Sequence, residues 1–170
     1  PYFFYLLHST FCLLSIFHHL PSTFYLLTSN LQLLPSNCYL ENVNPIYAEC
    51  GGLMYLTNSI TYGKKKSKMV GLFDVDTVMT KKMTLNYTEG KINSNCIISK
   101  PRNFRAHEFH YSKIINVPKD SKFLYDLKIG EGISSHKDAI TEYNTIASYC
   151  HLYFDSAKFA SNLIENTLKI

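Results

Sequence analysis

The charged residues of this 170-residue chain are distributed very unevenly. Residues 1–44 contain one charged side chain, Glu41, and no glycine, whereas the rest of the chain carries all 17 lysines and arginines. The second part interleaves charged with apolar residues, which excludes disorder, and its length suits one domain. We therefore divide the chain into an atypical apolar segment, 1–43, and a globular domain, 44–170.

The apolar segment allows two explanations. By hydropathy, Tyr2–Leu20 and Phe24–Leu40 are candidate membrane spans. Histidines interrupt the first run, no lysine or arginine flanks either run, and a chain that opens with Pro1 lacks the start of a signal peptide. A bias toward Phe, Tyr, Leu and Ser would also arise from an AT-rich gene read in the wrong frame. We favour this frameshift artefact over a membrane anchor.

Cysteine and lysine usage excludes two further classes. The five cysteines are odd in number and form no C-x-x-C pair, so a disulfide scaffold is not expected. Four lysines gather within residues 64–68 without aromatic partners. This cluster is typical of a solvated loop, and we expect no nucleic-acid partner.

A candidate nucleophile follows a short apolar run. Residues 43–48 predict a buried strand, and Glu49-Cys50-Gly51-Gly52 follows directly. Helix-like spacing then relates Leu53, Met54, Leu56 and Ile60. Strand, sharp turn and helix are the layout of a nucleophile elbow. Gly51 and Gly52 let backbone N–H groups approach an oxyanion, and the helix start favours a thiolate. The alternative is a buried cysteine beside a loop.

A thiolate nucleophile needs a general base, and His151 is the candidate. Residues 145–154 predict a strand that ends in a loop, and Asp155 or Ser156 can cap a terminal helix. The end of a strand is where a sheet presents site residues. A purely structural histidine is the alternative.

A second polar cluster lies between these points. Along an extended strand, His107 and Phe109 face one way, while Glu108 and His110 face the other. The two imidazoles therefore cannot share a metal ion, and we expect no metal site. We expect instead a substrate pocket, for which the candidates are His107, Glu108, His110, Tyr111 and Ser148.

Three segments in the same order resemble the cobyrinic acid a,c-diamide synthase family, which includes nickel-sirohydrochlorin a,c-diamide synthase. They are residues 45–56, 107–112 and 147–154. Residues 69–72 fall where the family has a strand. The resemblance implies an α/β, flavodoxin-like class I glutamine amidotransferase domain of the CobB/CobQ type.

In that family the cysteine attacks the amide of glutamine and releases ammonia. The resemblance implies that Cys50 is the nucleophile and His151 the general base. Ordinary class I amidotransferases place a glutamate two residues after the histidine, where this chain has Tyr153. The resemblance therefore implies a Cys–His dyad, in which His151 is less strongly oriented.

The family's ammonia serves a synthetase domain that uses ATP and Mg²⁺. The sequence has no G-x-x-x-x-G-K-[ST] pattern, and residues 1–44 lack the glycines of the family's oxyanion loop. We therefore expect an N-terminally incomplete domain. No cofactor is expected in this chain, ATP and Mg²⁺ belong to the missing N-terminal domain, and glutaminase activity should be at most trace.

The expected partners are glutamine and, through that synthetase domain, a tetrapyrrole dicarboxylate. The tetrapyrrole would be cobyrinate in cobalamin synthesis or nickel-sirohydrochlorin in coenzyme F430 synthesis. A cobyric acid synthase-like amidotransferase and an inactive or membrane-tethered remnant are the alternatives. We expect a cytoplasmic protein, and a homodimer is compatible with the sequence.

Overall fold

The computed structural model describes residues 6–7, 45–153 and 158–167. The apolar segment therefore lies outside the described residues except for Leu6 and Leu7, and so do the predicted caps Asp155 and Ser156. The elements, in order, are β1 (Leu6–Leu7), β2 (Ile46–Glu49), α4 (Gly51–Leu56), β3 (Ser59–Tyr62), β4 (Lys65–Lys68), β5 (Asp76–Ile92), β6 (Arg102–Ile115), β7 (Lys122–Ile129), β8 (Lys137–Glu142), β9 (Thr145–Ser148), β10 (Cys150–Leu152) and α5 (Phe159–Thr167).

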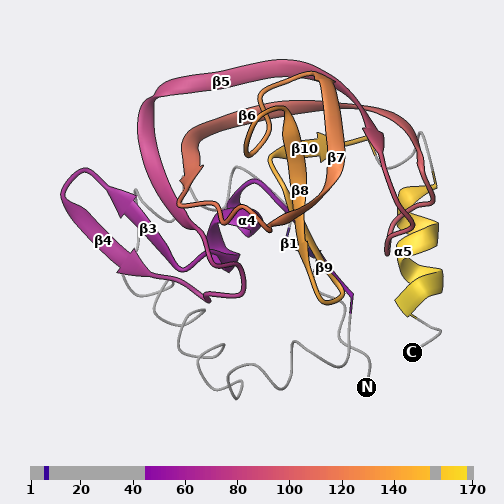
Figure 1. Ribbon diagram of the computed structural model, residues 1–170, viewed down its shortest axis with the longest axis horizontal. Coiled ribbons are helices and arrows are strands. Elements are labelled where there is room, and N and C mark those ends of the chain that lie inside the picture. The colour runs from indigo at the N-terminus through magenta and orange to yellow at the C-terminus, as the bar shows by residue number, and fades with distance from the viewer. Residues whose placement is uncertain (1–5, 8–44, 154–157, 168–170) are drawn as a thin grey trace.

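The strands form one mixed sheet. Its main path runs β1-β2-β9-β8-β7-β5-β3-β4, and β6 pairs with both β5 and β10. The pairs β1–β2, β2–β9 and β3–β5 are parallel, and the others are antiparallel. In Figure 1, β5 and β6 arch across the top, with the β3–β4 hairpin at one end and α5 at the other. A mixed sheet with helices agrees with the predicted α/β class. The described residues, however, lie mostly in strands, with only the helices α4 and α5 among them.

The long strands β5 and β6 correct one prediction. The turn-forming residues within 86–105 predict a variable surface connection, but residues 86–92 and 102–105 belong to these strands and only 93–101 connects them. Along β6, buried and exposed side chains alternate through most of its length. The period of two is typical of a strand with one face on the core. The pairing of β6 with β5 therefore extends to both sides of residues 107–112.

Helix α4 is shorter than its apolar spacing predicted. It ends at Leu56, and Ile60 lies in β3 instead. Thr57 terminates the helix, because its hydroxyl donates to the carbonyl oxygen of Met54 at 2.7 Å and its backbone is extended. The strand expected at residues 69–72 is also absent, because these residues connect β4 to β5 without strand pairing.

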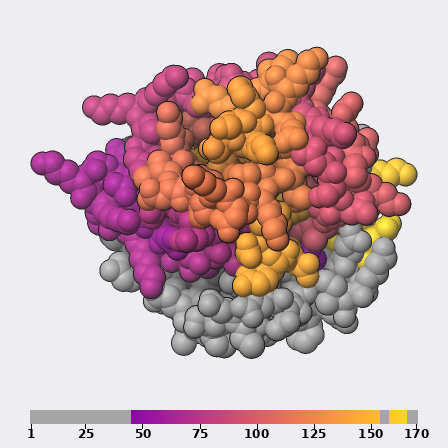
Figure 2. Space-filling model, in the orientation of Figure 1, coloured from indigo at the N-terminus to yellow at the C-terminus, as the bar shows by residue number. Residues whose placement is uncertain are grey.

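The lysine cluster is a strand rather than a loop. Residues 65–68 form β4, which pairs with β3 through a turn at Gly63, where φ is 59°. The hairpin projects from the edge of the molecule in Figure 2. Lysines on an edge strand oppose pairing with another chain, which accounts for a strand of such polar composition.

The central strands are buried on both faces. Tyr47 and Ile146 belong to one apolar cluster, which α5 joins through Phe159 and Leu163. The next residues along β2 and β9, Ala48 and Ala147, belong to a second cluster on the other face. Continuous burial of this kind is typical of the parallel part of a sheet. No helix among the described residues is long and apolar enough to cross a membrane.

Asp138 holds the turn from β9 to β10. Its carboxylate is fully buried and accepts hydrogen bonds from the backbone N–H groups of Tyr149 at 3.1 Å and Cys150 at 2.8 Å. Burial raises the pKa of Asp138 to about 6, and these hydrogen bonds oppose that rise. The acid therefore supplies hydrogen-bond acceptors where the chain passes from one strand to the next.

We expect Asp138→Ala to lower the free energy of unfolding by about 2–4 kcal/mol, because two buried N–H groups lose their acceptor and each loss costs about 1–3 kcal/mol. Urea denaturation measures the change. Asp126→Ala on the exposed side of β7 is the control, and its effect should stay within about 0.5 kcal/mol. Equal effects of the two substitutions would contradict the role of Asp138.

Candidate active site

Cys50 lies at the end of β2, between the strand and α4. Its backbone N–H donates to the carbonyl oxygen of Ser148 at 2.8 Å, and its own carbonyl oxygen accepts the N–H of Met54 at 3.0 Å. Its φ of 49° and ψ of −98° are strained for a residue other than glycine. The predicted layout of strand, sharp turn and helix is thus present, and the turn projects the thiol from the strand end.

Gly51 and Gly52 are the first two residues of α4, and both are buried. Their N–H groups precede the first intrahelical hydrogen bond, from Met54 to Cys50. N–H groups without an intrahelical partner can donate hydrogen bonds to the negatively charged oxygen of a tetrahedral intermediate formed at a neighbouring sulfur. The structure therefore keeps both glycines as oxyanion candidates.

The chain around His151 differs from the prediction. Instead of one strand that ends in a loop, β9 stops at Ser148 and the chain bends at Tyr149 into a second short strand, β10. This strand pairs antiparallel with β6 and places His151 opposite His107. A continuous apolar run gives no sign of the bend, because it depends on the buried carboxylate of Asp138.

Glu49 completes a group that the sequence patterns did not indicate. Its side chain is 2% exposed, and Oε2 lies 3.4 Å from Nδ1 of His151. Oε1 accepts the Tyr47 hydroxyl at 2.6 Å and the backbone N–H of Leu152 at 2.9 Å. A glutamate at the end of an otherwise buried apolar strand was the available signal, because a buried carboxylate requires partners.

The imidazole of His151 is buried, at 6% exposure. Burial by itself lowers its pKa, but the interactions with Cys50 and Glu49 outweigh burial and raise the pKa of His151 to about 9. Nε2 has no hydrogen-bond partner among the described residues. This nitrogen is therefore available to exchange a proton with Cys50, whose Sγ contacts the Phe109 carbonyl oxygen at 3.5 Å.

His107 joins the group from β6. Its ring stacks on that of His151, with centroids 4.8 Å apart and planes 10° apart. Burial, and then the neighbouring His151, lower the pKa of His107. His110 is buried on the opposite face of β6, where its ring stacks on Tyr149. The predicted separation of the two imidazoles is thus confirmed.

Glu108 is engaged in contacts with the backbone rather than with Cys50 or His151. Its fully buried carboxylate accepts the backbone N–H groups of Glu131 at 3.0 Å and Gly132 at 2.6 Å. It therefore anchors the turn between β7 and β8. Glu108 also lies near Asp138 and Cys150 in a group that could hold a metal ion by proximity alone. Backbone N–H groups already donate hydrogen bonds to the oxygens of both acids. These hydrogen bonds, rather than a bound cation, compensate the two buried carboxylates.

The two remaining pocket candidates make local contacts. The Ser148 hydroxyl donates to the carbonyl oxygen of Cys150 at 2.8 Å and supports the bend between β9 and β10. The Tyr111 hydroxyl contacts Sδ of Met83 at 3.1 Å, and its ring meets Phe109 edge-on. Of the five pocket candidates, His107 is the one whose ring contacts the His151 ring.

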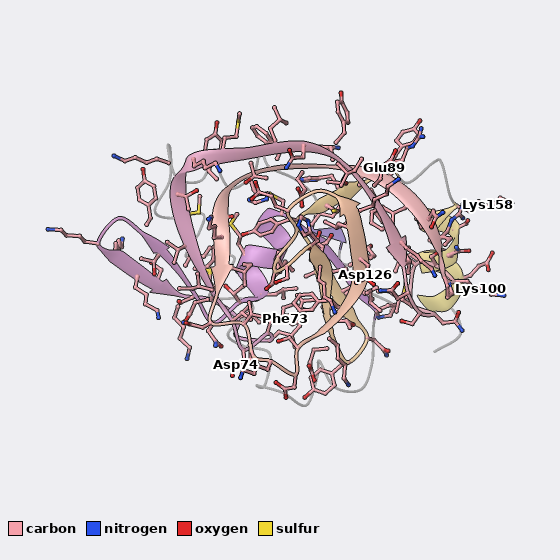
Figure 3. The ribbon with its side chains drawn as sticks, turned by 45° about the horizontal axis from the view of Figure 1, so that its top comes forward. Phe73, Asp74, Glu89, Lys100, Asp126 and Lys158 are labelled. Atoms are coloured by element: carbon pink, nitrogen blue, oxygen red, sulfur yellow. The ribbon has the colours of Figure 1, made fainter. Side chains whose placement is uncertain are left out.

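Two hollows of about 740 Å³ lie elsewhere on the described surface. One is bounded by the 95–103 turn and α5, beside which Figure 3 labels Lys100 and Lys158. The other lies along β5, β6 and β7, where Glu89 and Asp126 are labelled. Neither includes Cys50 or His151 in its lining. The candidate active site is instead a buried pair beside the exposed edge of His107.

Comparison with known proteins gives consistent matches. Residues 37–159 match the family described as CobB/CobQ-like glutamine amidotransferase domain. The cobyrinate a,c-diamide synthase of Sulfurisphaera tokodaii is 46% identical over 119 residues, which cover 69% of this chain and 27% of that protein. The enzyme of the same name from Methanosarcina barkeri is 38% identical over 136 residues, covering 71% of this chain and 28% of that protein. The chain thus spans about a quarter of the length of these relatives.

Among solved structures, a protein of Thermoplasma acidophilum described as a putative GMP synthase component has a TM-score of 0.48 and 16% identity. The match covers 74% of this chain and 58% of that one. This likeness is too weak to support an inference about fold or function.

We expect the imidazole of His151 to titrate near pH 9, against 6.5 for an unperturbed side chain. Because its folded pKa exceeds its unfolded pKa, protonated His151 stabilises the fold fully below pH 6.5, and this contribution is lost as pH rises through 9. NMR titration of the ring protons measures the midpoint. Cys50→Ala should lower it by removing one interaction that raises the pKa, and a wild-type midpoint at or below 6.5 would contradict the assignment.

Proposed function

The chain belongs to the family of CobB/CobQ-like glutamine amidotransferase domains, and we propose that it hydrolyses glutamine to supply ammonia to an amide ligase. The observation that carries this proposal is the interaction of a strained cysteine, which follows β2, with a buried histidine in β10. Cys50 precedes α4, and His151 approaches from β10 with a raised pKa. A thiol, a base and free helix N–H groups are the components of acyl transfer by a cysteine.

In the proposed reaction, Nε2 of His151 already holds the proton of the Cys50 thiol, and the resulting thiolate Sγ attacks the side-chain amide carbon of glutamine. The carbonyl electron pair moves onto oxygen, which the N–H groups of Gly51 and Gly52 stabilise. His151 then protonates the amide nitrogen, the C–N bond breaks, and ammonia leaves a glutamyl thioester. Water attacks this thioester with His151 as base, so that glutamate is released and the thiol is restored.

The raised pKa suits the step that releases ammonia. A group with a pKa of about 9 holds its proton at neutral pH, so His151 carries the proton that the leaving nitrogen needs. Because Cys50 and His151 are 2% and 6% exposed, a side chain already in place can supply the proton to the leaving nitrogen directly. His107 closes the outer side of the His151 ring by stacking on it.

We further propose that the ammonia amidates carboxylates of a tetrapyrrole. Relatives named cobyrinate a,c-diamide synthase support this substrate class, and the matched segment covers about a quarter of their length. Activation of the carboxylates with ATP and Mg²⁺ is assigned to sequence outside the segment present here. Cobyrinate is the substrate that these names favour, with nickel-sirohydrochlorin as the second candidate.

A glutamine-analogue electrophile such as a diazo ketone should label Cys50 before any other cysteine, although its side chain is only 2% exposed. Peptide mapping of the labelled chain identifies the site, and an ammonia assay with glutamine measures hydrolysis. Cys50→Ser should abolish both labelling and ammonia release. Cys96→Ser is the matched control, because Cys96 is more exposed and burial raises the pKa of its thiol. Prior labelling of Cys96 would contradict the proposed nucleophile.

Glutamine-dependent amidation should appear when the chain is combined with the remaining part of a longer relative, ATP, Mg²⁺ and cobyrinate. Mass spectrometry of the tetrapyrrole detects each added amide. Cys50→Ser should stop amidation from glutamine while amidation from added ammonia persists, since the sulfur acts only on glutamine. Product from nickel-sirohydrochlorin alone would replace the cobyrinate assignment with the second candidate.

A further inference from the structure

The buried carboxylate of Glu49 takes part in no step of the proposed reaction, yet its two oxygens have different surroundings. Oε1 is fixed by two donors, the Tyr47 hydroxyl at 2.6 Å and the N–H of Leu152 at 2.9 Å. Oε2 faces Nδ1 of His151 at 3.4 Å. The donors on Oε1 therefore aim the second oxygen at the imidazole.

We propose that Glu49 is the positioning residue of the active site, holding the Nδ1–H of His151 so that Nε2 faces the sulfur of Cys50. The proposal rests on the proposed glutaminase function and replaces the expected Cys–His dyad with a group of three. An acid on the far nitrogen fixes the tautomer of a catalytic histidine and stabilises its imidazolium form. Tyr153, which occupies the position of the glutamate in ordinary class I amidotransferases, has no carboxylate and is 65% exposed.

The location of the acid is unusual because it directly precedes the nucleophile in the chain. Side chains of successive strand residues point to opposite faces, so Glu49 and Cys50 would diverge if β2 continued. The strand stops at Glu49, and the strained turn at Cys50 redirects the thiol. Both residues consequently act on His151, which β10 introduces between them and His107.

Glu49, Cys50 and His107 face His151 from the elements packed against it, and His110, on the other face of β6, also interacts with it electrostatically. Glu49 on β2 and Cys50 before α4 favour the imidazolium, whereas His107 on β6 is lowered in pKa by its neighbour and disfavours a second positive charge. Removing the Glu49 charge leaves Cys50 as the group that favours the imidazolium, against burial and His107. The His151 midpoint should then move toward acidic pH.

Glu49→Gln tests the proposal while retaining the shape and an acceptor for Leu152. With the amide oxygen on the Oε1 side, the NH₂ group donates to Nδ1 and places the proton of neutral His151 on Nε2, which can no longer accept the thiol proton. We expect kcat for glutamine hydrolysis to fall by about 10²–10⁴-fold with little change in KM. The NMR midpoint of His151 should shift to lower pH, and so should the pH profile of Cys50 alkylation.

Asp138→Asn is the matched control. Asp138 is likewise a buried acid that accepts a backbone N–H of β10, from Cys150, but His151 is not among its hydrogen-bond partners. It should lower the free energy of unfolding and leave the His151 midpoint in place. Equal shifts in the two variants would show that Glu49 acts only by anchoring β10, which would overturn the proposal.

Wild-type protein provides a test that no folding defect can obscure. Above the His151 midpoint, ¹⁵N shifts of the ring identify the nitrogen that keeps the proton, and we expect Nδ1. A proton on Nε2 would overturn the positioning role. If His151 behaves as expected but no variant or wild-type chain releases ammonia, the proposed function fails while the contact between Glu49 and His151 stands.

Discussion

Parallel pairing of β2 with β9 is the constraint on which the active site depends. The pairing sets Glu49 opposite Ser148, residues that are 99 positions apart in sequence. Parallel strands end at the same edge of a sheet, so the turn at Cys50 and the bend at Tyr149 begin side by side. The hydrogen bond from the Cys50 N–H to Ser148 extends the ladder one residue past β2. Cys50 is thereby fixed relative to the strand that leads to His151.

Buried carboxylates hold the irregular segments around this edge. Glu49 accepts the backbone N–H of Leu152 in β10, Asp138 accepts two N–H groups at the β9–β10 bend, and Glu108 accepts two in the β7–β8 turn. A buried charge is tolerated only when hydrogen bonds compensate its lost hydration. Each acid therefore depends on the backbone segment that it stabilises. These segments also pack into the apolar core, through Leu152 in one cluster and through Ile133 and Tyr149 in the other.

The sequence predicted the parts of the site that follow local rules. The elbow at Cys50, the alternation of His107 and Glu108, and the terminal helix all show in short patterns of burial and turn residues. The bend at Tyr149 and the role of Glu49 could not be predicted in this way. Both depend on contacts between residues distant in sequence, and an apolar run or a lone acid does not specify its partner.

Local composition gave wrong predictions for strands that are largely exposed to solvent. The lysines of β4 indicated a loop because an edge strand with two solvated sides lacks apolar alternation. The polar stretch over 86–105 indicated surface connections, although most of it continues the paired strands β5 and β6. Pairing over these residues is supplied by the partner strand, and the sequence of one strand does not reveal the length of its ladder.

The positive φ at Cys50 lowers the stability of the fold, so this residue is retained only where selection requires its sulfur. Glycine adopts this conformation without a clash of its Cβ, so replacement of Cys50 by glycine would relieve the backbone while removing the sulfur. In a copy of the domain that no longer needs the thiol, replacement of Cys50 would therefore increase stability and be expected early. In degraded copies of such genes, a cysteine retained at this turn is therefore a marker of how recently selection acted.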